Sequence, residues 1–137
     1  MPDRVPPVVD LLFACEDARY DEQGDVYTVV NPLGTTVVMP AGVVGNFVLE
    51  ELVVFAQALD AVGEFQFRVE VRDEAGLRVA RSPPQGYEFD VNERLFAKQL
   101  VFRIADVEFS KPGAYQIVLM VGEKEIGRRL LRVLPGE

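Results

Sequence analysis

Residues 64–72 alternate apolar and polar side chains without a break, and this alternation is the strongest constraint on the fold of the chain. The apolar positions are Phe65, Phe67, Val69 and Val71. Successive side chains of a β-strand point to opposite faces, so a period of two predicts a strand with one buried and one solvated face. The turn-forming stretch 73–76 and a strand-like run at 77–81 follow directly, which predicts a β-hairpin.

Comparable strand-like runs recur along the chain, separated by turn-forming residues at intervals of about ten residues. Valine alone accounts for 23 residues, and side chains branched at Cβ favour strands over helices. We therefore expect an all-β fold, an antiparallel β-sandwich of eight or nine strands that forms one domain over residues 1–137. The further strands are expected at 8–20, 26–30, 50–59, 87–91, 99–105, 114–121 and 125–133.

Four local expectations accompany this fold. Residues 31–34 read Asn-Pro-Leu-Gly and are predicted to end the second strand in a turn. Apolar residues at every second position of the first strand predict that Cys15 points into the core. The run 114–121 is apolar on both faces, which is typical of a central strand. The alternation slips at 128–131, which predicts a β-bulge in the last strand.

The residue types that are missing exclude several chemistries. The chain has no His and one Cys. It therefore lacks the usual catalytic triad, a His-based zinc site and an internal disulfide. Lys and Arg number 14 against 22 Asp and Glu, a formal net charge of −8. This charge argues against nucleic acid and anionic membranes as partners, and no cofactor is expected.

The cellular setting follows from similar observations. The first residues contain no apolar leader, and no apolar stretch has the character of a transmembrane helix. A single Cys fits a reducing compartment, so we expect a cytoplasmic protein.

The second half of the sequence carries a recognisable pattern. The segment 109–115 reads Phe-Ser-Lys-Pro-Gly-Ala-Tyr, and Gly122-Glu-Lys-Glu-Ile-Gly127 precedes a final apolar run. With the turns at 21–25 and 73–76, this pattern resembles a family of short, uncharacterised bacterial proteins with an immunoglobulin-like β-sandwich. The resemblance implies an immunoglobulin-like fold and a bacterial setting, and it implies no catalytic or binding residues.

An acidic turn follows the first expected strand and is one candidate site. Asp17, Asp21, Glu22 and Asp25 offer carboxylate oxygens, the ligands that Ca²⁺ prefers. The spacing matches no EF-hand, and a solvated turn explains the same residues. A calcium-binding or small-ligand-binding β-sandwich that uses the turn 16–25 is therefore the alternative function.

The irregular segment 33–49 is the preferred functional candidate. Exposed apolar residues there would form a contact surface for a protein partner or a second copy, as in a homodimer. The alternative is that the segment folds over the sheets and closes the core. The interface residues proposed on this basis are Val37, Val38, Met39, Val43, Val44 and Phe47.

The remaining candidates are a basic stripe and a nucleophilic side chain. The residues Arg78, Arg81, Arg128, Arg129 and Arg132 would form one basic stripe if their two strands were neighbours. No His is present to activate a Cys or Ser nucleophile. The sequence thus favours a non-catalytic interaction or structural domain over an enzyme.

Overall fold

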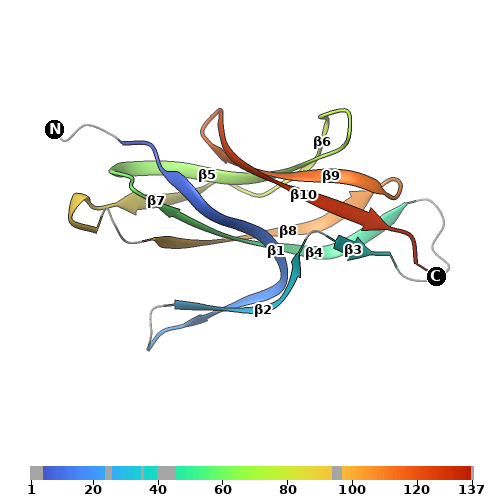
Figure 1. Ribbon diagram of the computed structural model, residues 1–137, viewed down its shortest axis with the longest axis horizontal. Coiled ribbons are helices and arrows are strands. Elements are labelled where there is room, and N and C mark those ends of the chain that lie inside the picture. Colours follow the sequence, from blue (N-terminus) through green and yellow to red (C-terminus); the bar gives the residue numbers. More distant parts are fainter. Residues whose placement is uncertain (1–4, 24–25, 35, 40–45, 94–96, 137) are drawn as a thin grey trace.

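The computed structural model describes residues 5–23, 26–34, 36–39, 46–93 and 97–136. In this part of the chain ten β-strands form two open sheets, and there is no α-helix (Figure 1). The four-stranded sheet has the order β2-β1-β4-β8. The six-stranded sheet has the order β3-β10-β9-β5-β6, and β7 also pairs with β5. The all-β prediction is confirmed, whereas the predicted eight or nine strands are ten.

The elements are β1 (Val8–Asp21), β2 (Val26–Gly34), β3 (Thr36–Val38), β4 (Phe47–Leu59), β5 (Gly63–Arg72), β6 (Arg78–Arg81), β7 (Gln85–Phe89), the 3₁₀ turn η1 (Val91–Glu93), β8 (Lys98–Phe109), β9 (Gly113–Val121) and β10 (Lys124–Leu134).

The main hydrophobic core lies between the two sheets. Inward side chains of β1, β4 and β8 meet those of β5, β9 and β10, and Phe67, Phe102 and Phe109 are among its largest fully buried members. The strand β9 lies between β10 and β5, so the predicted central strand is confirmed. The predicted hairpin is also confirmed, because β5 and β6 pair in antiparallel orientation.

One strand pair breaks the antiparallel pattern. The short strand β3 pairs with the end of β10 in parallel orientation, with Val38 opposite Leu134. The other strand pairs of the described residues are antiparallel, as predicted, so the pair of β3 with β10 is the exception. Parallel strands need a long connection. A turn signal in the local sequence therefore cannot predict a pair that joins residues 36–38 to 132–134.

The strand β2 continues through the predicted turn at 31–34. Its register with β1 shifts between Ala14 and Cys15, where Pro32 lies opposite Cys15. Proline donates no backbone hydrogen bond and is tolerated on an edge strand or at a bulge. Both conditions hold here, because β2 is at the edge of its sheet and the register shift marks an irregularity at this point. The turn prediction is therefore wrong.

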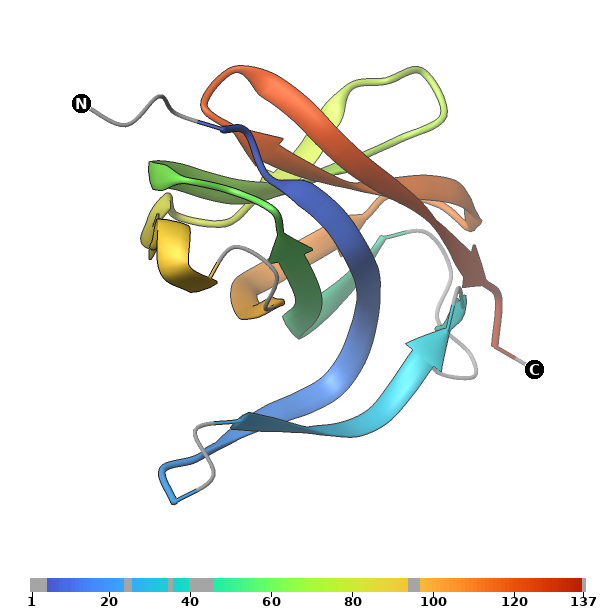
Figure 2. The same cartoon turned by 60° about the vertical axis from the view of Figure 1, so that its left-hand side comes forward.

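The four-stranded sheet carries a second, smaller apolar cluster apart from the main core. Cys15, Ala18, Val53 and Phe55 are its buried members. The sheet bends at this point, and the hairpin of β1 and β2 projects from the body of the molecule (Figure 2). The backbone N–H of Tyr27 in β2 donates a 2.8 Å hydrogen bond to Gln99 Oε1 in β8. The bent sheet thus brings its two edge strands together at this point.

Cys15 is buried as predicted, but in this second cluster rather than in the main core. The β1 residues in the main core are Leu12 and Ala14, whereas Leu11 is exposed. The inward face predicted for β1 was Val9, Leu11, Phe13 and Cys15. It is correct at Val9, which packs against the main core, and wrong from Leu11 onward, because the register with β4 shifts between Val9 and Leu11.

Two irregularities set the direction of side chains near the ends of the sheets. Asp106 in β8 has a positive φ of 54°, and the buried positions change there from even to odd numbers. In β10 the register with β9 shifts between Glu125 and Gly127. The bulge predicted at 128–131 therefore lies closer to the start of the strand.

Candidate functional site

An apolar surface flanked by arginines lies on the outer side of the six-stranded sheet, where β10 meets β3. Leu131 and Val133 point into the core, so Arg128, Leu130, Arg132 and Leu134 point outward. Val38 lies beside Leu134 in the parallel pair. We call the outward residues Val38, Arg128, Leu130, Arg132 and Leu134 the β10 face.

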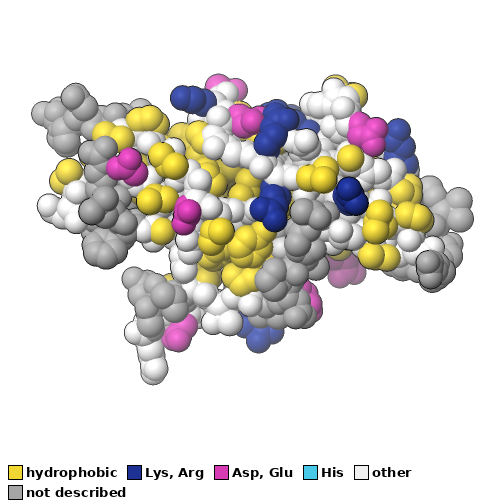
Figure 3. Space-filling model, viewed as in Figure 1, with side chains coloured by type: hydrophobic (Ala, Val, Ile, Leu, Met, Phe, Trp, Pro, Cys, Tyr) yellow, Lys and Arg dark blue, Asp and Glu magenta, His cyan; other side chains and the backbone are white. Residues whose placement is uncertain are grey.

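The apolar members of the β10 face are open to solvent. The exposed fractions are 61% for Val38, 41% for Leu134 and 37% for Leu130. Figure 3 shows basic side chains along β10 and hydrophobic side chains near the end that adjoins β3. Neighbouring exposed apolar side chains with a polar rim are typical of contact surfaces.

The predicted interface residues divide between this surface and the core. Val37 and Met39 are buried in the main core, and Phe47 packs against it. Val38 alone among the described candidates is strongly exposed. Val43 and Val44 lie outside the described residues. The described part of the segment 33–49 thus closes the core with Val37 and Met39 and presents Val38 and Val48 to the surface.

A ladder of ion pairs continues from the β10 face across the same sheet. Glu70 on β5 accepts hydrogen bonds from Arg68 Nε at 3.0 Å and from Arg72 Nη2 at 3.0 Å. Arg72 also lies 3.6 Å from Glu125, which pairs with Arg128. The ladder therefore joins β5 to the rim of the β10 face.

Glu70 is the buried member of this ladder, with only 4% of its surface exposed. Burial favours the neutral carboxyl group, but hydrogen bonds from Arg72 and Arg68 outweigh it and lower the pKa of Glu70. The alternation of 64–72 predicted a solvated side for this strand, and at Glu70 that prediction is wrong. The arginine side chains cover the carboxylate, and Arg72 also contacts the sulfur of Met120 on β9.

The five arginines proposed as a basic stripe do not form a single row. The strands β6 and β10 are separated by β9 and β5, so Arg78 and Arg81 lie across the sheet from the β10 arginines. Arg128 and Arg132 belong to the β10 face, whereas Arg129 follows the opposite alternation.

The described carboxylates proposed for the acidic turn, Asp17, Asp21 and Glu22, do not form a cluster that could hold a metal ion. Asp17 is drawn toward β8, where Arg103 Nη2 donates to Asp17 Oδ1 at 2.9 Å and Nη1 to Glu51 Oε1 at 2.9 Å. The hydrogen bond from Arg103 is the main reason that the pKa of Asp17 is lowered. Asp21 accepts the backbone N–H of Gln23.

Glu22 is exposed in the turn, and Asp25 lies outside the described residues. Within the ranges that the structure describes, no group of three or more acidic or Cys side chains is placed to hold a metal ion.

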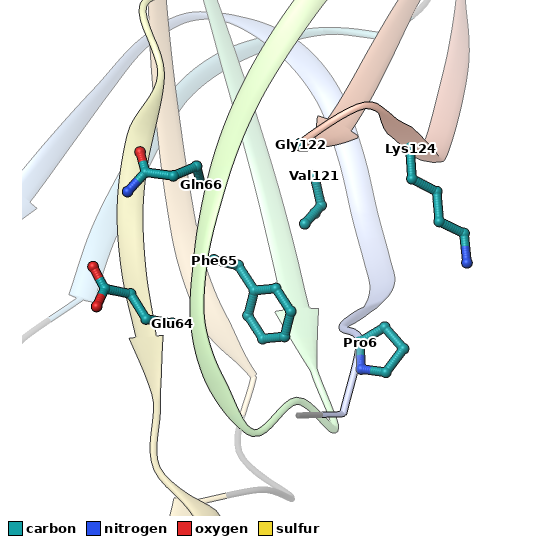
Figure 4. A pocket seen from close by; sticks show the side chains of 7 residues that line it. All are labelled: Pro6, Glu64, Phe65, Gln66, Val121, Gly122 and Lys124. Atoms are coloured by element: carbon teal, nitrogen blue, oxygen red, sulfur yellow. The ribbon is translucent and has the colours of Figure 1, made fainter. Parts of the chain in front are cut away.

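A shallow hollow of about 640 Å³ lies between the start of β5 and the turn from β9 to β10. Phe65 and Val121 point into it, whereas Glu64 and Gln66 lie on the other side of β5 (Figure 4). Among the described residues, Glu64 is the single carboxylate in its lining. The described lining therefore shows no pair of carboxylates of the kind that acid–base hydrolysis uses.

The single thiol is poorly placed for nucleophilic chemistry. Burial, and then the negative charge of Asp17, raise the pKa of Cys15. A thiol is reactive as the thiolate, so a raised pKa disfavours reaction.

A family model of proteins of unknown function (DUF6941) matches residues 10–134. The chain belongs to this family. The match begins within β1 and ends at Leu134, the last residue of β10, so it includes the β10 face. No curated protein sequence matches the chain significantly. No helix in the described part of the chain has the length and apolar character needed to cross a bilayer.

Sequence reasoning missed two of the three apolar residues of the β10 face. Leu130 and Leu134 belong to a run in which Arg128, Leu130, Arg132 and Leu134 occupy alternate positions. This mixed Arg–Leu alternation is the signal that could have identified them.

Proposed function

We propose that the protein is a non-catalytic interaction domain that self-associates through the β10 face. The observation that carries the proposal is the exposure of Val38 beside Leu134 in the parallel strand pair, with Leu130 on the same side of β10. Burying a large apolar side chain stabilises a complex by about 1.5–3 kcal/mol when the burial is complete. Three partly exposed side chains, with arginines around them, supply the apolar centre and polar rim of a modest interface.

The chemistry of the described residues supports a non-catalytic role. Cys15 is buried and its pKa is raised, and no His is present to act as a base. Glu70, the most buried carboxylate, is held by two arginines and is therefore a poor proton donor at neutral pH.

Analytical ultracentrifugation over a concentration series tests the proposal. We expect wild-type protein to self-associate, and Val38→Glu and Leu134→Glu each to weaken association at least tenfold, because each places a charge in the apolar centre of the contact. Leu77→Glu is the matched control, since Leu77 is 66% exposed in the turn between β5 and β6. A strictly monomeric wild-type protein, or equal effects of all three substitutions, would contradict the proposal.

We also propose that the two sheets form an immunoglobulin-like sandwich. In that fold strands B and E pair in one sheet, and strands G, F and C are neighbours in the other. The pair β4–β8 fits the positions of strands B and E, and the row β10–β9–β5 fits those of strands G, F and C. In addition, the Tyr115 hydroxyl at the start of β9 donates to the Lys111 carbonyl at 2.8 Å, which is the geometry of a tyrosine corner.

The expected bacterial and cytoplasmic setting also remains a proposal. The single, buried Cys15 supports a reducing compartment. Fractionation of cells that express the tagged protein tests it, and recovery from a secreted or membrane fraction would contradict it.

A further inference from the structure

The charges of the strands are divided between the two sheets. The six-stranded sheet is mainly basic and the four-stranded sheet is mainly acidic. The strands of the six-stranded sheet carry eight basic side chains, Arg68, Arg72, Arg78, Arg81, Lys124, Arg128, Arg129 and Arg132, and four acidic ones, Glu64, Glu70, Glu88 and Glu125. Those of the four-stranded sheet carry eight acidic side chains, Asp10, Glu16, Asp17, Asp21, Glu50, Glu51, Asp106 and Glu108, and three basic ones, Arg19, Lys98 and Arg103.

An acidic counterpart of the β10 face lies on the four-stranded sheet. At the start of β4 and the end of β8, Phe47, Leu49, Val107 and Phe109 pack in the main core. The residues that alternate with them, Val48, Glu50, Asp106 and Glu108, are exposed. Val48 is 50% exposed and is paired in register with Glu108. We call these four exposed residues the acidic patch.

The two surfaces match in composition and in charge. Each has an exposed aliphatic centre, Val48 in the acidic patch and Val38 with its leucine neighbours in the β10 face. Within the described part of the chain, Arg132, Glu50 and Asp106 have no ion-pair partner. Charges without internal partners are available to pair across a contact, where opposite signs steer association and fix orientation.

We propose, on the basis of the proposed function, that the partner of the β10 face is the acidic patch of a second copy of this chain. A symmetric contact of two β10 faces would place Arg128 and Arg132 of one copy against the same residues of the other, and like charges in contact are unfavourable. Contact between the β10 face and the acidic patch replaces this repulsion with attraction.

The geometry makes the contact head-to-tail. The β10 face is on the outer side of one sheet and the acidic patch on the outer side of the facing sheet, with the core between them. Each copy therefore presents one surface of each kind in different directions. A contact between unlike surfaces continues from copy to copy and produces a ring or a filament.

A charge-swap experiment tests this arrangement. Arg128→Glu with Arg132→Glu makes both surfaces acidic, and Glu50→Lys with Glu108→Lys makes both basic. We expect each double variant alone to associate at least tenfold more weakly than wild type, and an equimolar mixture of the two to recover association, measured by sedimentation velocity. Association of the wild type should also weaken at least about tenfold between 50 and 500 mM NaCl, because salt screens the charges.

Circular dichroism of each double variant establishes that it is folded. If both variants associate as well as wild type while Val38→Glu abolishes association, the head-to-tail arrangement is wrong and self-association through the β10 face stands. If each variant alone is impaired but their mixture recovers nothing, the pairing of these two surfaces is wrong. If the wild type is monomeric in low salt, both this inference and the proposed function are wrong.

Discussion

Glu70→Gln removes the buried negative charge from the ladder of ion pairs on the six-stranded sheet. The substitution keeps the shape of the side chain, so it isolates the charge. Glu70 accepts hydrogen bonds from Arg68 Nε at 3.0 Å and from Arg72 Nε and Nη2 at 3.2 and 3.0 Å. Hydrogen bonds to a charged group contribute about 1.5–3 kcal/mol to stability. Because both arginines are partly exposed and retain solvent, we expect a loss of about 1.5–2 kcal/mol at pH 7.

The pH dependence of the stability difference between wild type and Glu70→Gln tests the role of the charge. The pKa of Glu70 is lower in the folded protein than its ordinary value, which is about 4.3 for an unfolded chain. Its ionisation therefore stabilises the folded state fully above the unfolded pKa, and this contribution is lost as the pH falls through the folded pKa. The difference between wild type and Glu70→Gln should be largest near neutrality and should shrink in acid.

Urea denaturation at several pH values measures this difference directly. Glu123→Gln is the control, because Glu123 is 96% exposed and lies 3.9 Å from Arg68, and such surface pairs contribute less than about 1 kcal/mol. The reasoning is refuted if Glu70→Gln unfolds at the same urea concentration as wild type at pH 7. A stability difference that stays constant down to the acid limit would refute the electrostatic explanation in particular.

Three further substitutions or treatments follow from single contacts. Ser82→Ala should lose about 1–3 kcal/mol, because the buried Ser82 hydroxyl accepts the Val69 N–H at 2.8 Å and the variant leaves that donor unsatisfied. Tyr115→Phe should lose about 1 kcal/mol, because it removes the hydroxyl bond to the Lys111 carbonyl and keeps the ring. Cys15 should react with a thiol reagent far more slowly in native protein than in urea, because the thiol is buried and its pKa is raised.

The first two predictions are measured by chemical denaturation, and the third by the rate of thiol modification. Ser110→Ala is the control for Ser82→Ala, since Ser110 is exposed in the turn after β8. Equal stabilities of the two serine variants would contradict the role of the Ser82 hydroxyl. Native labelling of Cys15 as fast as labelling in urea would contradict its burial.

The alternation of apolar and polar residues predicted those features of the fold that depend on residues close together in the sequence. The hairpin of β5 and β6 was predicted because a strand with one buried face and a short turn leave a signal within 64–81. The alternation could not predict the burial of Glu70, which depends on arginines folding over it and on the neighbouring strand β9.

The period of two in the first strand was a poor guide to its orientation, because apolar side chains occupy both of its faces. The strand β1 contributes Leu12 and Ala14 to the main core and Cys15 and Ala18 to the second cluster. When both sides of a strand are covered, its hydrophobic pattern no longer distinguishes the two faces. The inward face of β1 from Leu11 onward was assigned incorrectly for this reason.

The candidate surface was predicted only in part because its strands are far apart in sequence. Val38 was identified within the segment 33–49, but Leu130 and Leu134 join it only through the parallel pairing of β3 with β10. A pair of strands so widely separated is specified by the assembled core rather than by any local motif.

The bend of the four-stranded sheet has a consequence for how the molecule opens. The strand β4 is enclosed by the main core on one side and by the Cys15 cluster on the other. Its amide hydrogens should therefore exchange with solvent more slowly than those of any other strand. The outer part of the hairpin, residues 17–21 of β1 with 26–30 of β2, extends beyond the pairing of β1 with β4, which ends at Cys15. Its apolar contacts are those of the smaller cluster. This outer part therefore forms a separate unit of local unfolding that can open while the paired part of β1 still covers β4.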